Sequence, residues 1–196
     1  MKPVLIFTVA LVVILAGCKA PSPKRLIHNK EFDWTITIPA NFDTLSPEQR
    51  ARMQKKGTDA IEKTYDGKVE NNAKTIFVFQ NDQFNYFESN YQPFNTEKDG
   101  NYIEAFRSVN NVLYHTFEVQ MPDAKLDSAS SQETISGLTF QVFKISIGLP
   151  NKMTLEFLMY SRLFDKKEFT VNIMTLDKAK QQLLLDAWKN STFGSK

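Results

Sequence analysis

The sequence of 196 residues predicts an α+β domain in which helices flank a mostly antiparallel sheet. Segments with the apolar pattern of strands come in groups, and segments with helical spacing separate these groups, which is typical of this class. Short turns near 148–152 and 164–166 join three successive strand segments close to the C-terminus. Such short connections favour an antiparallel meander.

The first strand and the first helix are predicted in the segment 32–63. Residues 32–38 alternate between apolar and polar side chains, so we expect a strand with one apolar face that ends at Pro39. Ser46 and Gln49, with Pro47 between them, have the spacing of a capping box. A helix to about Lys63 should follow, at the surface because its apolar face is thin.

The next segment predicts a pair of strands and a second helix. Residues 75–80 form a continuous apolar run of strand length, which favours burial on both faces, and residues 84–91 could return as its partner. Residues 99–119 carry apolar side chains at three- and four-residue steps, which is typical of an amphipathic helix. These side chains are Tyr102, Phe106, Val109, Leu113 and Phe117.

The last third of the chain predicts a polar loop at 121–131, then strands near 138–147, 153–162 and 167–174. The first of these strands changes its apolar phase between Val142 and Phe143. Either a β-bulge at this point or burial on both faces would explain the change. A final helix should begin at Asp177 and bury the apolar side chains Leu183, Leu184, Ala187 and Trp188.

The N-terminal segment has the features of an export signal. A positive charge at Lys2 precedes an apolar run at 3–16, which is shorter than the roughly 20 residues of a membrane-spanning helix. The run ends in Leu15-Ala16-Gly17-Cys18, which resembles the lipobox of bacterial lipoproteins. The resemblance implies that residues 1–17 are removed as a signal peptide and that Cys18 becomes the lipid-bearing N-terminus. Because Cys18 is the only cysteine of the chain, acylation would also account for an exported protein without disulfides.

After Cys18 the sequence predicts a tether at 18–30 and a single domain at 31–196. The tether contains Pro21 and Pro23, and proline-rich segments behave as semi-rigid spacers. Its basic residues could either lie against anionic lipid head groups or remain solvated. They are Lys19, Lys24, Arg25 and Lys30. No Asp follows Cys18, so we expect an outer-membrane anchor that faces the periplasm.

Composition and motifs argue against several classes of function. The net charge of +2 disfavours nucleic acid as a partner. The two histidines, His28 and His115, are far apart in the chain and form no catalytic or zinc motif. The acids Asp123, Asp127 and Glu133 lack the spacing of a calcium loop. We therefore expect no catalytic residue, no metal site and no cofactor.

The segment 84–94 is the one candidate contact surface. Its aromatic residues alternate with Asn, Gln and Ser, as in protein interfaces, where aromatics supply area and amides supply hydrogen bonds. The alternative is a half-buried strand that needs aromatics for its core. The candidate binding residues are Phe84, Tyr86, Phe87, Tyr91 and Phe94.

The order of elements is similar to that of the PsbP-like α/β/α sandwich, which includes small bacterial lipoproteins of the DcrB type. The matching features are the opening segment 34–39, the late meander, and a closing helix that ends in Asn190-Ser191-Thr192-Phe193. The resemblance implies a fold and does not decide a function.

Three functions remain open from the sequence. The first is a non-enzymatic, membrane-anchored interaction module that assists an envelope protein partner. The second is a carrier or sensor of a small apolar ligand, suggested by the sixteen phenylalanines. The third is an enzyme without a recognisable motif.

Overall fold

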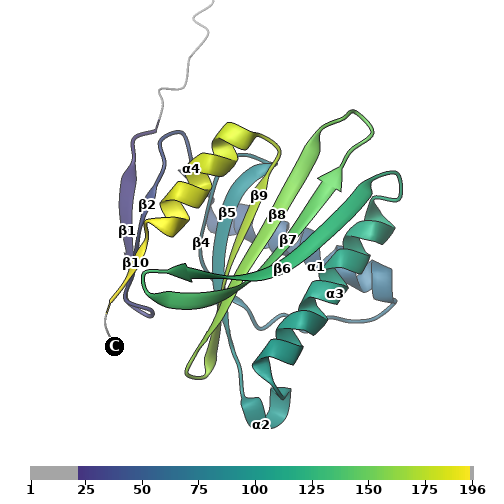
Figure 1. Ribbon diagram of the computed structural model, residues 1–196, viewed down its shortest axis with the longest axis horizontal. Coiled ribbons are helices and arrows are strands. Elements are labelled where there is room, and N and C mark those ends of the chain that lie inside the picture. Colours follow the sequence, from purple (N-terminus) through teal and green to yellow (C-terminus); the bar gives the residue numbers. More distant parts are fainter. Residues whose placement is uncertain (1–21, 195–196) are drawn as a thin grey trace, which may run out of the picture.

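The computed structural model describes residues 22–194, and the expectations for Cys18 and the signal segment lie outside these residues. A large sheet has the strand order β3-β4-β5-β9-β8-β7-β6, and a small sheet has the order β1-β2-β10 (Figure 1). Neighbouring strands are antiparallel throughout, which confirms the predicted α+β class. The strands are β1 Arg25–Asn29, β2 Trp34–Ile38, β3 Asp43–Thr44, β4 Lys74–Asp82, β5 Asn85–Pro93, β6 Lys125–Ile135, β7 Leu138–Gly148, β8 Thr154–Phe164, β9 Lys167–Thr175 and β10 Thr192–Phe193. The helices are α1 Pro47–Tyr65, α2 Thr96–Asp99, α3 Tyr102–Gln120 and α4 Lys178–Lys189.

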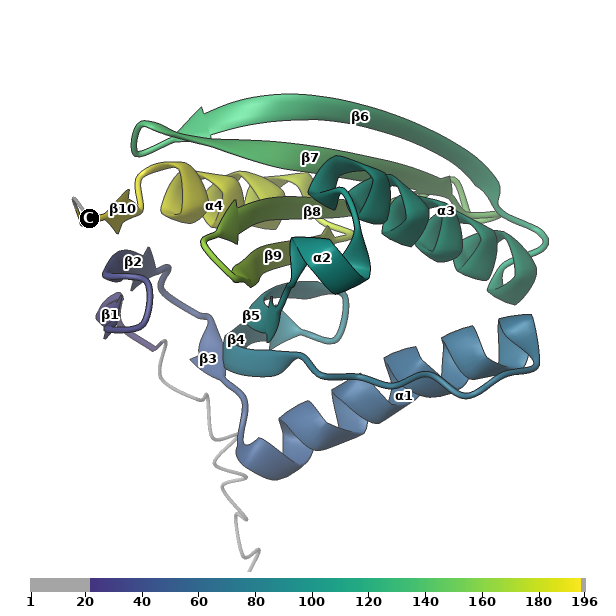
Figure 2. The same ribbon diagram turned by 90° about the horizontal axis from the view of Figure 1, so that it is seen from below.

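One face of the large sheet packs against the small sheet and α4. Trp34 from β2 and Trp188 from α4 are fully buried in this aromatic core, together with Phe87 and Phe169 from the large sheet. Figure 2 shows the small sheet on the left and α1 and α3 on the right. The layers therefore form an α/β/α arrangement, in which the small sheet reinforces the layer of α4.

The opposite face of the large sheet forms a second core with α3. Phe106 from α3 packs here with Phe143 and Ile145 from β7 and Phe157 from β8. This arrangement explains the phase change in β7, because Val142 belongs to the aromatic core and Phe143 to the second core. The register of β7 with both neighbours is unbroken, so the bulge is wrong and burial on both faces is confirmed.

Helix α1 begins as the sequence predicts. The Ser46 hydroxyl accepts a hydrogen bond from the Gln49 amide at 3.3 Å, and the Gln49 side chain accepts one from the Ser46 amide at 2.9 Å. Pro47 is the first helical residue. No residue of α1 is fully buried, and the helix contacts α3 at the surface.

The second predicted helix is divided and slightly rotated. Gly100 has φ +79°, a conformation that glycine adopts without strain, and it separates α2 from α3. Val109, expected on the buried face, is 42% exposed, and Asn110 is buried in its place. The buried stripe of α3 also has three- and four-residue steps, but it includes the polar Asn110, so the apolar pattern alone did not indicate it.

Two expectations near polar segments are wrong. Residues 125–131, expected in a loop, belong to β6, which pairs with β7 over its whole length. Residues 25–29, expected in the tether, form β1 and pair with β2, so the domain begins earlier than residue 31. Both are edge strands without a fully buried apolar face: β6 is mostly exposed, and β1 alternates between exposed and partly buried side chains, so neither has the apolar pattern by which a strand is recognised.

Candidate functional site

The aromatic segment 84–94 does not form one contact surface. Phe87 and Phe94 are buried, so the interpretation of these two residues as binding residues is wrong. Tyr86 and Tyr91 are partly buried, and only Phe84 is exposed. The physical reason is the place of β5 between β4 and β9, where side chains on both faces of the strand are covered. Phe87, for example, stacks on Phe79 with ring centroids 4.7 Å apart.

The other face of β5 carries a polar strip that the sequence analysis missed. Three cross-strand pairs between β5 and β9 form it, on the side of the sheet that carries the second core. The pairs are Glu88 with Asn172, Asn90 with Thr170, and Gln92 with Glu168. The two-residue spacing of polar residues in both strands could have predicted this strip. The sequence interpretation instead followed the aromatic residues that lie between them on β5.

One end of the polar strip is a chain of hydrogen bonds. Gln92 and Ser161 each donate to the carboxylate of Glu168 at 2.8 Å, and the Tyr102 hydroxyl donates to the Ser161 oxygen at 2.9 Å. Tyr102 is the first residue of α3, so the chain links that helix to three strands. Burial raises the pKa of the Tyr102 hydroxyl, which keeps it a neutral donor. The chain is suited to fixing α3 on the sheet.

The other end of the strip contains a carboxyl group in an unfavourable place. Burial raises the pKa of Glu88, and a hydrogen bond from Asn172 offsets only part of this effect. The Oδ1 atom of Asn172 is buried and has no hydrogen-bond partner within residues 22–194. Acids with shifted pKa values occur both at functional sites and in structural networks. With its raised pKa, Glu88 is the carboxyl group of the polar strip with the properties of a possible general acid.

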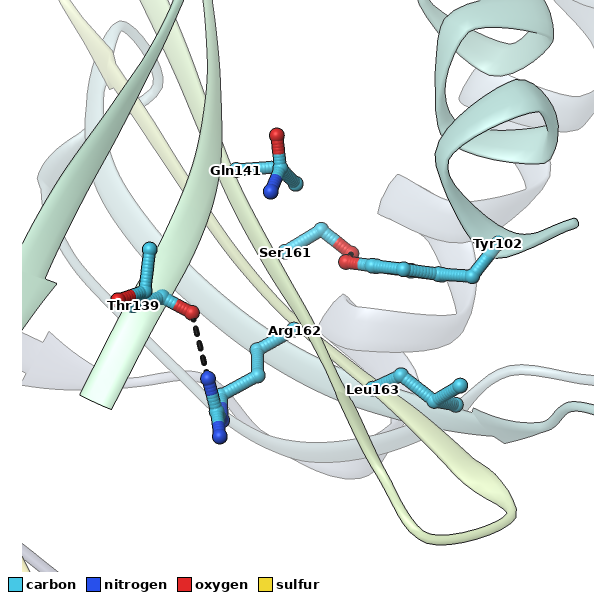
Figure 3. A pocket seen from close by; sticks show the side chains of 6 residues that line it. All are labelled: Tyr102, Thr139, Gln141, Ser161, Arg162 and Leu163. Atoms are coloured by element: carbon cyan, nitrogen blue, oxygen red, sulfur yellow. Dashed lines mark hydrogen bonds between the residues drawn. The ribbon is translucent and has the colours of Figure 1, made fainter.

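A hollow of about 260 Å³ lies beside the hydrogen-bond chain (Figure 3). It opens where the pairing of β7 with β8 ends at Gln141 and Ser161, and Arg162 spans the gap by donating to the Thr139 carbonyl at 2.7 Å. Its lining is Tyr102, Thr139, Gln141, Ser161, Arg162 and Leu163. A second hollow, of about 590 Å³, is lined by α1 and the turn after it, with charged residues such as Asp59 and Lys63. Neither has the mainly apolar lining that is typical of a small-molecule site.

The outer edge of β6 is an extended polar surface. Residues 127–132 are all exposed, and within residues 22–194 no strand pairs with this edge. β6 has eleven residues, and it pairs with β7 without a register shift. The Tyr114 hydroxyl donates to the Leu126 carbonyl at 3.5 Å, and over residues 127–132 no strand of the described chain covers the outer edge of β6.

The histidines and the loop acids do not assemble a site. His115 lies at the surface with Nδ1 3.1 Å from a Glu118 oxygen, and His28 contacts Thr35 at 3.0 Å. Glu133 forms an ion pair with Lys189 at 2.6 Å. In the described part of the chain, no three His, Cys, Asp or Glu side chains come together as metal ligands. None of the helices in residues 22–194 is long and apolar enough to cross a membrane.

No protein-family model and no curated protein sequence matches the chain. Among solved structures, the chain is similar to cyanobacterial PsbP (CyanoP) from Synechocystis sp. PCC 6803, with a TM-score of 0.56 over 87% of this chain and 92% of that protein. The fold is PsbP-like. The Ran-binding protein Mog1p from Saccharomyces cerevisiae also matches, with a TM-score of 0.42, 10% identity, and coverage of 87% of this chain and 95% of that protein.

The PsbP-like fold confirms the architecture that the segment 34–39, the meander and the closing helix predicted. CyanoP and this chain share 7% of their residues, so the similarity extends to the fold alone. The function of a PsbP-like domain with so different a sequence has to be argued from its own side chains and edges.

Proposed function

We propose that this protein is a lipid-anchored, non-enzymatic interaction module of the bacterial cell envelope. Cys18 carries the lipid in the outer membrane, facing the periplasm, and β6 binds an extended segment of an envelope protein. The observation that carries the proposal is the long outer edge of β6, with which no strand of residues 22–194 pairs.

The edge of β6 has few of the features that usually protect a sheet from strand addition, and its charged residues, Lys125, Asp127 and Glu133, lie toward its two ends. Natural edge strands are short, bulged, or interrupted by proline or inward charges. β6 is about twice the usual strand length, and it contains neither proline nor a register shift. Its centre, Ser128–Gln132, carries no charge. An extended segment could therefore pair with β6 through main-chain hydrogen bonds, as in other cases of β-strand addition.

The location rests on the N-terminal sequence. The lipobox-like Leu15-Ala16-Gly17-Cys18 supports a lipid anchor, and two or more acyl chains hold a protein stably at a membrane. A partner within the same envelope would be at high effective concentration, because both proteins are confined near one surface. At such a concentration, strand addition of modest affinity is sufficient to keep the two proteins bound.

The polar strip supports a structural role better than an enzymatic one. The carboxylate of Glu168 is held by Ser161 and Gln92, and Tyr102 is engaged with Ser161, so these groups bind one another. Glu88 lies inside the domain and does not line either hollow. A carrier of an apolar ligand is not favoured, because both hollows are polar.

Site-specific photo-crosslinking in intact cells tests the proposal. A photoreactive amino acid at Ser130, in the centre of β6, should capture a defined envelope protein, whereas the same group at Leu183, which is exposed on α4, should not. Ser130→Lys should weaken capture by a probe at Ser128, because a charge in the edge opposes strand addition. Equal adducts at both positions, or none at Ser130, would contradict the role of β6.

The anchor has its own test. Metabolic labelling with a fatty acid should mark the wild-type chain, and Cys18→Ser should abolish the label. A wild-type chain that takes up no label would contradict the lipid anchor.

A further inference from the structure

The structured domain begins very close to the proposed lipid anchor. The carbonyl of Ser22 accepts a hydrogen bond from the Asn41 amide at 3.0 Å, so the domain already holds the chain at this residue. Three residues lie between Cys18 and Ser22, and even a fully extended chain over these four residue-to-residue steps spans only about 14 Å. The head-group layer itself is several ångströms thick. The part of the domain next to Ser22 therefore has to lie at the membrane surface.

The element next to Ser22 is β1, and its two faces differ in character. Arg25, Ile27 and Asn29 are partly buried against the domain, and the alternate residues of the strand point outward. The outward residues are exposed, and they combine positive charge with one large apolar side chain. They are Lys24, Leu26, His28 and Lys30.

Leu26 is the central residue of this outward face. It is 72% exposed, more than any other exposed large apolar residue of the described chain. Its cross-strand neighbour on β2 is Thr37, which is also exposed, so the surroundings of Leu26 are open. A single exposed leucine is common on protein surfaces. This one lies between Lys24 and Lys30, on the strand nearest the anchor.

The charged residues of the β1–β2 hairpin lie at both ends of β1. Lys24 lies at the end next to Ser22, and the exposed acid Asp33 lies in the turn at the far end of β1. His28, between them, is 3.7 Å from an Asp33 oxygen. Lys30 lies at the same end of β1 as Asp33, so a lysine borders the outward face of β1 at each end.

We infer that the outward face of β1 is a membrane-contact surface, in which Leu26 enters the interface and Lys24 and Lys30 lie at anionic head groups. This inference rests on the lipid anchor of the proposed function and adds the orientation of the domain. The occupant of the surface is the lipid bilayer. The contact fixes which side of the domain faces the periplasm, because the small sheet then lies on the membrane.

A reporter at residue 26 tests the inference in the full lipidated protein. Cys18 is the only cysteine and its sulfur is acylated in the mature protein, so Leu26→Cys provides a unique thiol for an environment-sensitive fluorophore. The labelled protein is reconstituted into vesicles of phosphatidylethanolamine and phosphatidylglycerol that contain spin-labelled lipid. The matched control is Leu183→Cys, an exposed leucine on α4.

The expected result is blue-shifted emission at residue 26 and about twofold stronger quenching by the lipid spin label than at residue 183, since an interfacial side chain lies within the head-group and acyl boundary. Lys24→Glu with Lys30→Glu should reduce this quenching, and the matched pair Lys152→Glu with Lys178→Glu should not. Equal, water-like signals at 26 and 183 would overturn the inference. A blue shift at residue 26 without lipid quenching would also overturn it, because a second copy or another protein would then cover β1.

Flotation of the same vesicles separates the two proposals. Protein that floats while residue 26 remains in water contradicts only the contact surface. Protein that does not float contradicts the lipid anchor, and with it the contact surface that depends on the anchor.

Discussion

The rings of Trp34 and Trp188 meet edge to face, with centroids 5.9 Å apart. Trp34 belongs to β2 and Trp188 to α4, and neither has any exposed surface. The contact therefore joins the first strand pair of the domain to its last helix. Phe169 of β9 touches both rings, at 5.1 Å from Trp34 and 6.3 Å from Trp188, so the large sheet closes the same cluster.

Removal of Trp188 should destabilise the whole domain. Trp188→Ala deletes the largest side chain of α4 from a packed core, and such changes typically cost about 3–5 kcal/mol. Urea unfolding followed by circular dichroism measures the loss. Leu183→Ala on the same helix is the control, and it should change the free energy of unfolding by no more than about 0.5 kcal/mol because Leu183 is exposed. A loss below 1 kcal/mol for Trp188→Ala would contradict the central place of this residue.

The hydrogen-bond chain predicts that Ser161 matters more than its size suggests. Ser161→Ala removes the acceptor of Tyr102 and one donor to Glu168, and both groups are largely buried. Leaving a buried polar group without its partner costs about 1–3 kcal/mol. The free energy of unfolding should fall by about that amount, and Ser131→Ala on the exposed β6 should have almost no effect. If Ser161→Ala left the free energy of unfolding unchanged, this would show that water replaces the lost hydrogen bonds.

Asp82 should stabilise the start of α4 at neutral pH. Burial raises the pKa of Asp82, but hydrogen bonds from Lys180 at 2.7 Å, the Phe84 amide and Asn85 outweigh it, so the pKa is lowered. The stability it contributes is present above the unfolded pKa of about 3.9 and is lost as pH falls through the lower folded pKa. Because Asp82 is partly exposed, Asp82→Asn should cost only about 1 kcal/mol at pH 7.

Unfolding measured at several pH values checks this prediction. The difference between wild type and Asp82→Asn should shrink in strong acid. Lys180→Met should have a similar effect, because it removes the same ion pair, and Lys178→Met, exposed on α4, serves as the control. A difference that stays constant down to strong acid would contradict the role of the charge.

The sequence predicted most of the fold, because periodicity reports burial. Alternation over 32–38, the continuous run at 75–80 and the capping box at Ser46 are direct consequences of local geometry, and the corresponding elements form as expected. β6 and β1 could not be recognised by the same means. Most side chains of β6 and alternate side chains of β1 face solvent, and main-chain pairing with β7 and β2 stabilises these strands, which leaves no clear apolar pattern.

The candidate site was harder to predict than the fold. The aromatics of β5 looked like a contact surface, and the decisive information was the number of strands beside β5, which the sequence does not contain. The polar strip depends on register, since Glu88 meets Asn172 and Gln92 meets Glu168 only in the observed pairing of β5 with β9. Pairings between strands so distant in the chain are not fixed by local propensity.

Glu88 should destabilise the folded protein at neutral pH. Burial raises its pKa in the folded state, so the folded protein is most favoured below the unfolded pKa of about 4.3 and loses stability as pH rises through the folded pKa. Glu88→Gln removes the charge and keeps an oxygen that accepts a hydrogen bond from Asn172. The variant should be more stable than wild type at pH 7, by on the order of 1 kcal/mol, and the two should converge below about pH 4.

Asn172→Ala should act in the opposite direction, because it removes the hydrogen bond that favours the charged carboxylate. Urea unfolding of all three proteins across this pH range provides the measurement. A Glu88→Gln protein that is less stable than wild type at neutral pH would contradict this prediction, because it would mean that more than Asn172 stabilises the carboxylate.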